Sequence, residues 1–187
     1  MRIVAGKFRG RRLESPDSKR IRPTADRVRE AVFSIIAAEV PGSQVLDLFA
    51  GTGALGLEAL SRGADRAVFV DQGAEAVRII QTNAQRLGVS DQVEVYQGGV
   101  TRIVRRLAER KVCFDLLFMD PPYGKGHLEI TLPLLNNLAR PHALLIAEHP
   151  VREPPPQSCV EWHHIETRTY GDTAISFYSK VTSDTPV

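Results

Sequence analysis

The chain has 187 residues, 43% of them hydrophobic, and a formal net charge of +2 at pH 7, which suits one domain with a buried core. Its apolar runs are far shorter than the ~20 residues that span a bilayer, and the N-terminus lacks the apolar core of a signal peptide, so we exclude a membrane protein and expect a cytoplasmic one. Cys113 and Cys159 show no metal-ligand spacing, so we expect reduced thiols and no bound metal.

Positive charge is concentrated near the N-terminus. Residues 1–30 hold ten Lys or Arg and four Asp or Glu, a net charge of +6, so the remaining 157 residues carry −4. A basic segment on an acidic body predicts contact with a polyanion, although a solvated arm without a partner fits the charge equally well. The candidate phosphate contacts are Lys7, Arg9, Arg11, Arg12, Arg22 and Arg27.

The first elements follow from local residue patterns. Residues 2–13 mix β-forming residues with two glycines, which predicts a small β-hairpin or an extended arm. A polar loop ends at Pro23, and apolar residues at helical spacing predict a helix over 25–39 that Thr24 can cap. We therefore expect a basic arm over residues 1–23, a main domain over 24–181 and a frayed tail over 182–187.

Strand-like and helical stretches then alternate along the chain. The predicted strands are 44–50, 66–72, 93–97, 114–120 and 143–149, and the predicted helices between them are 54–62, 74–87, 101–110 and 126–139. Two further β-runs, 159–169 and 174–180, are joined tightly enough to form an antiparallel hairpin. This alternation predicts an α/β fold with a seven-stranded, mostly parallel sheet and helices on both faces.

A glycine-rich loop follows the first predicted strand. DLFAGTGALG (47–56) contains the pattern G-x-G-x-x-G, and Asp71 stands twenty residues beyond Gly51, which together match a dinucleotide-binding fingerprint. Gly51 and Gly53 allow the backbone to approach a ligand closely. Asp47 would repel a pyrophosphate and attract an ammonium group, so the loop favours S-adenosylmethionine over NAD, while Asp71 can bind ribose hydroxyls in either case.

The stretch DPPYGKG (120–126) follows the fourth predicted strand. Its two prolines cannot continue a sheet ladder, so the Pro121 carbonyl is expected to lack a sheet partner. That carbonyl and the Asp120 carboxylate can accept both hydrogens of an exocyclic amino group. Tyr123 offers a flat face on which a base can stack. The stretch therefore predicts a site for an amine on a nucleobase, with Asp120, Pro121, Pro122 and Tyr123 as its catalytic residues.

These motifs resemble the class I S-adenosylmethionine-dependent methyltransferases that act on amino groups of bases, which have a Rossmann-like fold. RPTADRVREAVFSII (22–36), DLFAGTGALGLEALSRGA (47–64), DPPYGKG and RTYGDTAISFY (168–178) are together similar to the RsmD family, which methylates N2 of guanine 966 in 16S ribosomal RNA. The resemblance covers residues 1 to about 180. It implies S-adenosylmethionine as the cofactor and binding of the assembled or assembling small ribosomal subunit through the N-terminal arm. Separately, we expect a monomer and no metal.

The resemblance also implies a strand order of 3-2-1-4-5-7-6, with the seventh strand antiparallel, and positions for the cofactor. Phe49 stands where many class I enzymes have the first glycine of this loop, and QGGV (97–100) lacks the acid that many relatives place near the adenine amine. We expect backbone groups of Gly99 and Val100 to hold the adenine instead. The expected cofactor-binding residues are Asp47, Phe49, Ala50, Gly51, Gly53, Asp71, Gln72, Gly99 and Val100.

Three alternative functions remain open at this point. An adenine-N6 DNA methyltransferase would also use DPPY, but the short chain leaves no second domain for reading a DNA sequence. An NAD-dependent oxidoreductase would leave DPPY unexplained. A non-catalytic RNA-binding assembly factor could keep the fold, but it would not need Asp47, Asp71 and DPPY together. The five histidines show no metal or catalytic-triad arrangement.

Overall fold

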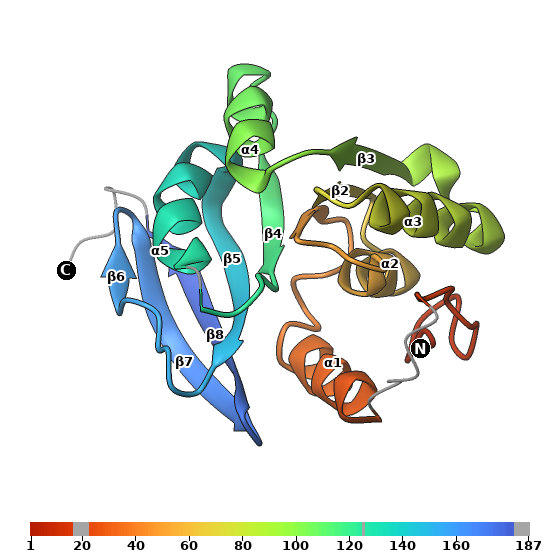
Figure 1. The fold of residues 1–187 in the computed structure, drawn as a ribbon, viewed down its shortest axis with the longest axis horizontal. Coiled ribbons are helices and arrows are strands. Elements are labelled where there is room, and N and C mark those ends of the chain that lie inside the picture. Colours follow the sequence, from red (N-terminus) through yellow and green to blue (C-terminus); the bar gives the residue numbers. More distant parts are fainter. Residues whose placement is uncertain (17–22, 125, 182–187) are drawn as a thin grey trace.

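The computed structural model describes residues 1–16, 23–124 and 126–181 (Figure 1). The predicted tail over 182–187 therefore lies outside the described residues. One sheet runs through the molecule, with the strand order β3-β2-β1-β4-β5-β8-β7-β6. Its strands are β1 Gln44–Leu48, β2 Arg66–Asp71, β3 Val93–Gln97, β4 Phe114–Met119, β5 Ala139–Pro150, β6 Ser158–Cys159, β7 Trp162–Tyr170 and β8 Thr173–Lys180.

The sheet confirms the Rossmann-like α/β class and the predicted strand order. Strands β1 to β5 pair in parallel, whereas β8 runs antiparallel to both β5 and β7. Strands β7 and β8 are the sixth and seventh strands of the prediction. The eighth strand of the described sheet is the two-residue β6, paired antiparallel with β7. Two residues are too few to show the period-2 pattern that marks a strand in sequence.

Helices cover both faces of the sheet, as predicted. They are α1 Pro23–Ile35, α2 Ala54–Ser61, α3 Ala74–Leu87, α4 Val100–Glu109 and α5 His127–Thr131, with 3-10 turns η1 Ser90–Gln92 and η2 Leu132–Leu138. Neighbouring side chains of a strand point to opposite faces, so Val45 of β1 packs with residues of α1, α2 and α3. Leu46 packs with residues of α4, α5 and η2 on the other face. Both core layers therefore share the central strands.

Two helix predictions need correction. The first helix begins at Pro23 rather than at residue 25, so Thr24 lies inside it; proline suits the first helical position because its missing N–H has no helical partner there. The helix also ends at Ile35, and turns replace the predicted residues 36–39. The stretch 126–139 is not one helix, because α5 ends at Thr131 and a 3-10 helix carrying Pro133 follows.

The N-terminal segment, defined here as residues 1–16, is folded onto the body of the protein. An antiparallel bridge between Arg2 and Arg12 closes its loop, which corresponds to the expected hairpin. The segment buries the hydrophobic side chains Ile3, Phe8 and Leu13. Figure 1 shows it beside α2 and α3. The N-terminal segment therefore contributes to the hydrophobic core and is not a separate arm.

Glu58 of α2 anchors the N-terminal segment. Its fully buried carboxylate accepts hydrogen bonds of 2.8 and 2.9 Å from the backbone amides of Val4 and Ala5. It also forms ion pairs with Arg62 at 2.8 Å and Arg29 at 3.5 Å. A buried carboxylate is stable only when such partners satisfy it, so docking of the segment and folding of α2 depend on each other.

Candidate active site

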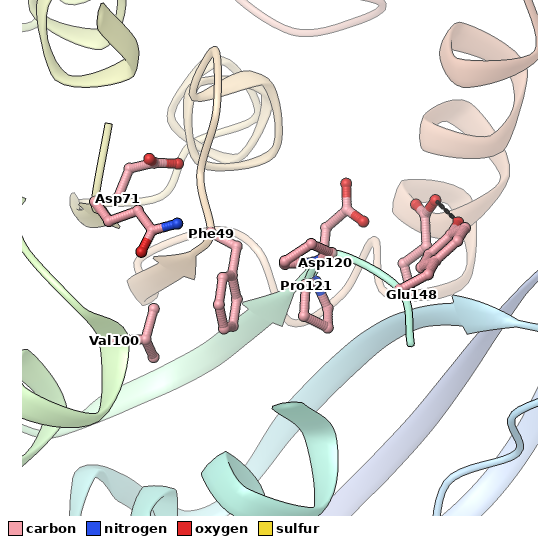
Figure 2. Close-up of a pocket in the computed structure, with 9 residues that line it drawn as sticks. Phe49, Asp71, Val100, Asp120, Pro121 and Glu148 are labelled. Atoms are coloured by element: carbon pink, nitrogen blue, oxygen red, sulfur yellow. Dashed lines mark hydrogen bonds between the residues drawn. The ribbon is translucent and has the colours of Figure 1, made fainter. Parts of the chain in front are cut away.

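Two adjoining pockets lie beyond the carboxyl ends of the central strands, the position where open α/β sheets bind ligands. The first pocket, of about 510 Å³, is lined by Phe49, Asp71, Gln72, Val100, Asp120, Pro121, Pro122, Tyr123 and Glu148 (Figure 2). The second pocket, of about 240 Å³, shares Phe49, Asp120 and Glu148 with the first and adds Asp47, Ala50 and Gly51, among others. The glycine loop, the DPPY stretch and Asp71 therefore meet at one site, as the sequence predicted.

The glycine loop has a left-handed backbone at three positions. Phe49 has φ 58°, Gly51 φ 54° and Gly53 φ 75°. Such a conformation is rare for a residue with a large side chain and is typical of functional sites. A Cβ atom added at Gly51 would meet nothing within 4 Å, whereas one at Gly56 would lie 2.4 Å from the Phe69 ring. The first glycine therefore leaves the loop open to a ligand, and the last lets α2 pack against β2.

Asp71 ties the glycine loop to the end of β2. Its Oδ2 accepts a hydrogen bond of 2.9 Å from the Gly51 amide, and its Oδ1 accepts one of 2.8 Å from the Gly73 amide. Each carboxylate oxygen can accept more than one hydrogen bond. Because Asp71 also lines the first pocket beside Gln72 and Val100, its carboxylate can bind the two hydroxyls of a ribose there.

Asp47 places a buried carboxyl group at the second pocket. Its Oδ2 accepts a hydrogen bond of 2.9 Å from the Gly56 amide, and its side chain is almost fully buried. Burial raises the pKa of Asp47 to about 8, even though the Gly56 hydrogen bond acts in the opposite direction, and the charges of Asp120 and Asp71 raise it further. A cationic group bound in the second pocket would lower the pKa of Asp47, because it stabilises the ionised carboxylate.

Residues 120–123 follow the end of β4. Both ladders of that strand end at Met119, so Pro121 lies beyond them. The Tyr123 hydroxyl donates a hydrogen bond of 3.2 Å to Oε1 of Glu148 and lies 3.3 Å from Oγ1 of Thr173. The Tyr123 residue is 49% exposed, so its ring is accessible to a base that enters from solvent.

Asp120 is exposed to solvent, lines both pockets and carries a carboxyl group with a perturbed pKa. The pKa of Asp120 is raised to about 7, mainly because neighbouring protein atoms displace water from its carboxyl group. The negative charge of Glu148 raises it further. Figure 2 shows the two carboxyl groups pointing to the same side of the site. Sequence analysis missed Glu148, which lies inside the predicted strand 143–149. Ligands bind at the carboxyl ends of the strands in open α/β sheets. Asp120 follows such an end, and Glu148 lies near the end of β5, so the same rule could have identified Glu148.

Two predicted cofactor residues line neither pocket. Gly53 is buried under Phe69 and Ile80, and Gly99 occupies the position before the first residue of α4. Val100 lines the first pocket (Figure 2). The structure therefore brings together seven of the nine predicted cofactor residues and assigns Gly53 to the turn itself.

The basic residues of the N-terminal segment face solvent. Lys7, Arg9, Arg11 and Arg12 are exposed, as is Arg27 of α1, whereas Arg22 lies outside the described residues. Arg9 and Arg27 line a groove of about 420 Å³, and Met1 of the same segment lines the second pocket. The N-terminal segment therefore adjoins the candidate active site through Met1, and its groove also contains the acids Asp26 and Glu30. Phe8 packs on the body rather than offering its ring to solvent, since it is 6% exposed.

The described residues contain neither a candidate metal cluster nor a membrane-spanning helix. No group of three or more His, Cys, Asp or Glu side chains is arranged to hold a metal ion in that part of the chain. No described helix is long and apolar enough to cross a membrane. Cys113 and Cys159 are free thiols and partly buried.

Comparison with known proteins gives consistent results over nearly the whole chain. The family model described as Conserved hypothetical protein 95 matches residues 1–179. The chain is 35% identical over 187 residues to ribosomal RNA small subunit methyltransferase D of Escherichia coli, covering 96% of this chain and 90% of that protein. It is 33% identical over 182 residues to YlbH of Bacillus subtilis, covering 96% and 99% of the two chains.

Solved structures have the same architecture. The yhhF protein from Escherichia coli superposes with a TM-score of 0.84 at 33% identity, covering 97% of this chain and 98% of that one. An RNA methyltransferase from Salinibacter ruber, in complex with S-adenosyl-L-homocysteine, superposes with a TM-score of 0.64 at 17% identity, covering 86% and 94%. The second likeness concerns the fold alone.

Proposed function

The chain belongs to the RsmD family of ribosomal RNA methyltransferases, and from this premise we propose that it transfers a methyl group from S-adenosylmethionine to N2 of guanine 966 in 16S ribosomal RNA. One observation carries the proposal. Asp120 and Pro121, the expected acceptors of an amino group, line the same pocket as Asp71, the expected ribose ligand. An amine acceptor and a nucleoside-binding carboxylate in one pocket suit methyl transfer from a nucleoside cofactor to a base.

The residues of the site fit S-adenosylmethionine, which supplies an electrophilic methyl group on a sulfonium when it is bound. Asp71 would accept hydrogen bonds from the ribose hydroxyls, and Val100 and the backbone before it would contact the adenine. Asp47, with its pKa raised to about 8, would pair with the ammonium group in the second pocket. The open face of Gly51 would let the backbone approach the cofactor closely.

Asp120 and Pro121 would act on the nucleophile. The N2 lone pair of guanine is delocalised into the ring, so the amine is a poor nucleophile. Hydrogen bonds from N2 to the Asp120 carboxylate and the Pro121 carbonyl would favour a tetrahedral nitrogen and stabilise its developing positive charge. A carboxyl group with a pKa of about 7 is also suited to receive the N2 proton near neutral pH.

The target base must leave its stack to reach this site, since a stacked amine is shielded. The exposed ring of Tyr123 would receive the unstacked guanine, and base–aromatic stacking contributes about 1–3 kcal/mol. The basic N-terminal segment, which adjoins the second pocket through Met1, would bind the phosphates on either side of the target. Recognition of RNA at unpaired loops lowers the free-energy cost of extracting the base.

Methyl transfer to small ribosomal subunits tests the proposal. Subunits from cells that lack the enzyme, naked 16S ribosomal RNA and duplex DNA are each incubated with labelled S-adenosylmethionine and the purified protein. The wild type should label the ribosomal RNA substrates and leave the DNA unlabelled. Asp120→Ala should abolish labelling while its dissociation constant for S-adenosylmethionine stays within about a few-fold of wild type. Full activity of Asp120→Ala would contradict the proposed role of this carboxylate.

A further inference from the structure

A second carboxylate stands beside Asp120, and the reaction described above does not use it. Met119 of β4 pairs with Ala147 of β5, and the next residues along these parallel strands are Asp120 and Glu148. Both line both pockets, and their side chains point to the same side of the site (Figure 2). The site therefore presents two neighbouring acceptors rather than one.

We propose that Glu148 makes the site select guanine over adenine by accepting a hydrogen bond from N1–H of the bound base. This inference rests on the proposed function, because it assumes that Asp120 and Pro121 hold the reacting amine. In guanine the atom next to the N2 amine is N1, which carries a hydrogen. In adenine the atom next to the N6 amine is also N1, but it carries a lone pair and no hydrogen.

A carboxylate discriminates between these two edges because it can only accept hydrogen bonds. Two adjacent acceptors, Asp120 and Glu148, match the two adjacent donors of guanine. With adenine the Glu148 carboxylate would face the N1 lone pair, and both groups would lose water without gaining a hydrogen bond. A site built to bind a donor rejects the analogue that lacks it, and flipped bases are commonly recognised at this edge.

The position of Glu148 is fixed by its neighbours. Its Oε1 accepts the hydrogen bond from the Tyr123 hydroxyl at 3.2 Å, and Tyr123 is the residue on which the base would stack. A base on the Tyr123 ring would therefore bring its edge close to the Asp120 and Glu148 carboxylates. The same hydrogen bond offers a competing explanation, in which Glu148 only orients Tyr123, and the experiment must separate the two.

The test uses 2-aminopurine, which keeps the N2 amine of guanine but has a lone pair at N1. Full-length 16S ribosomal RNA is ligated with guanine, 2-aminopurine or adenine at the mapped target position and reconstituted into small subunits. The wild type should methylate guanine at least about 10-fold faster, in kcat/KM, than 2-aminopurine, since a hydrogen bond to a charged group accounts for a factor of this size. Equal rates on the two bases would overturn the inference without any variant.

Variants separate base recognition from orientation of Tyr123. Glu148→Gln should lower the guanine to 2-aminopurine preference to near 1 or invert it, because a side-chain amide can donate to N1. Tyr123→Phe removes the hydrogen bond to Glu148 but keeps the carboxylate and the ring, so its preference should equal that of the wild type. Glu153→Gln, which alters the acceptor of the Gly124 amide, is the matched acidic control and should also keep the preference.

Two results would overturn the inference at this stage. One is an unchanged preference in Glu148→Gln, and the other is an equal loss of preference in Tyr123→Phe, which would assign the effect to the orientation of the ring. Affinity for S-adenosylmethionine, measured by calorimetry, confirms that each variant is folded. Absence of methylation on the guanine subunits by the wild type would instead overturn the proposed function itself, so the two failures can be told apart.

Discussion

The backbone amide of Gly51 donates a 2.9 Å hydrogen bond to Oδ2 of Asp71. The glycine loop after β1 and the acid at the end of β2 are therefore one unit, in which the carboxylate shapes the loop and also faces the first pocket. Their spacing in the sequence predicted a shared ligand. The structure adds that the loop conformation itself depends on this carboxylate.

Asp71→Ala should weaken binding of S-adenosylmethionine by about 10- to 100-fold. The substitution removes the acceptor of the Gly51 and Gly73 amides together with the proposed ribose contact, and each hydrogen bond to a charged group contributes about 1.5–3 kcal/mol. Isothermal titration calorimetry measures the dissociation constant. Asp65→Ala, at an exposed acid just before β2, is the control and should bind as the wild type does. Unchanged affinity in Asp71→Ala would refute the cofactor role.

The rate of methyl transfer should rise with pH through about 7. Partial desolvation of its carboxyl group and the charge of Glu148 raise the pKa of Asp120 to about 7, and the ionised form is the stronger hydrogen-bond acceptor for the amine. Glu148→Gln removes a neighbouring negative charge, so the pKa of Asp120 should fall and the midpoint of the profile should move to lower pH. Single-turnover rates at saturating cofactor between pH 5.5 and 8.5 measure both effects. A flat profile, or a shift to higher pH in the variant, would contradict the assignment.

Asp47→Asn should stabilise the free protein increasingly as the pH rises. The ordinary pKa of 3.8 applies to the unfolded chain, and burial raises the pKa of folded Asp47 to about 8. Below about pH 4 both states hold the proton, so the carboxyl group has no pH-dependent effect. Between about pH 4 and 8 only the folded state keeps the proton, so wild-type stability falls as the pH increases, and the loss is complete above about pH 8.

Thermal unfolding of cofactor-free protein at pH 5, 7 and 8.5 checks this sign. The Tm advantage of Asp47→Asn over the wild type should grow by more than about 4 °C across the range, since 1 kcal/mol corresponds to roughly 2–4 °C in a domain of this size. The variant should bind S-adenosylmethionine more weakly, because it has lost the partner of the ammonium group. A constant advantage would show that Asp47 is ionised in the folded protein at every pH tested, and either a constant or a shrinking advantage would contradict the raised pKa of Asp47.

Glu58→Ala should destabilise the protein by roughly 3–5 kcal/mol, the range for breaking a buried charge network. The change leaves the backbone amides of Val4 and Ala5 without their acceptor and removes one of the two carboxylates that pair with the buried Arg29, the other being Asp26. Urea unfolding measures the loss, and limited proteolysis should cut first within residues 1–16. Glu75→Ala, at an exposed position in the first turn of α3, is the control. Wild-type stability in Glu58→Ala would show that the N-terminal segment is not anchored there.

Neutralising Lys7, Arg9, Arg11 and Arg12 to glutamine should make RNA binding less dependent on salt. Each lost phosphate contact reduces the slope of log K against log salt by about 0.7–0.9, so four contacts would reduce it by about 3. Affinity for S-adenosylmethionine should not change. Substitution is a cleaner test than deleting residues 1–12, because deletion would also remove Ile3 and Phe8 from the core.

Arg105→Gln with Lys111→Gln provides a control for total charge. Both residues are exposed, at α4 and just after it, and α4 packs on the opposite face of the sheet from the N-terminal segment. This pair should leave the salt slope unchanged. An equal decrease per removed charge in both variants would mean that RNA responds to the net charge and not to the N-terminal segment.

The strands, the helices and the main site motifs could be predicted because they depend on local signals, whereas the order of the strands is implied only by the family resemblance. Strand-forming runs, helical spacing and the position of DPPY after a strand are all visible within short stretches. Strand β5 begins at Ala139, earlier than predicted, because Ala139 pairs with Phe114 of β4, and a register shift separates this pair from the next one at Leu144. Pairing of this kind depends on a neighbouring strand and leaves no mark in the local pattern.

Sequence could have placed Glu148 near a strand end, but it could not identify the partners of Glu148 or of Glu58, for the same physical reason. Glu58 lies in the middle of the α2 helix, and its partners Val4 and Ala5 are more than fifty residues away. The role proposed for Glu148 depends on Asp120 and Tyr123, which follow the end of the neighbouring strand β4. A local pattern predicts where a side chain lies on its own element, whereas its partners across the fold decide what it does.

The central claim is most directly tested by identifying the methylated nucleoside. Small subunits from cells that lack the enzyme are treated with the protein and S-adenosylmethionine, and their RNA is digested and analysed by mass spectrometry with mapping of the modified position. We predict a single new N2-methylguanosine, at position 966 of 16S ribosomal RNA. A methyl group on adenine N6, or no new methylated nucleoside in RNA treated with the wild-type protein, would contradict the account.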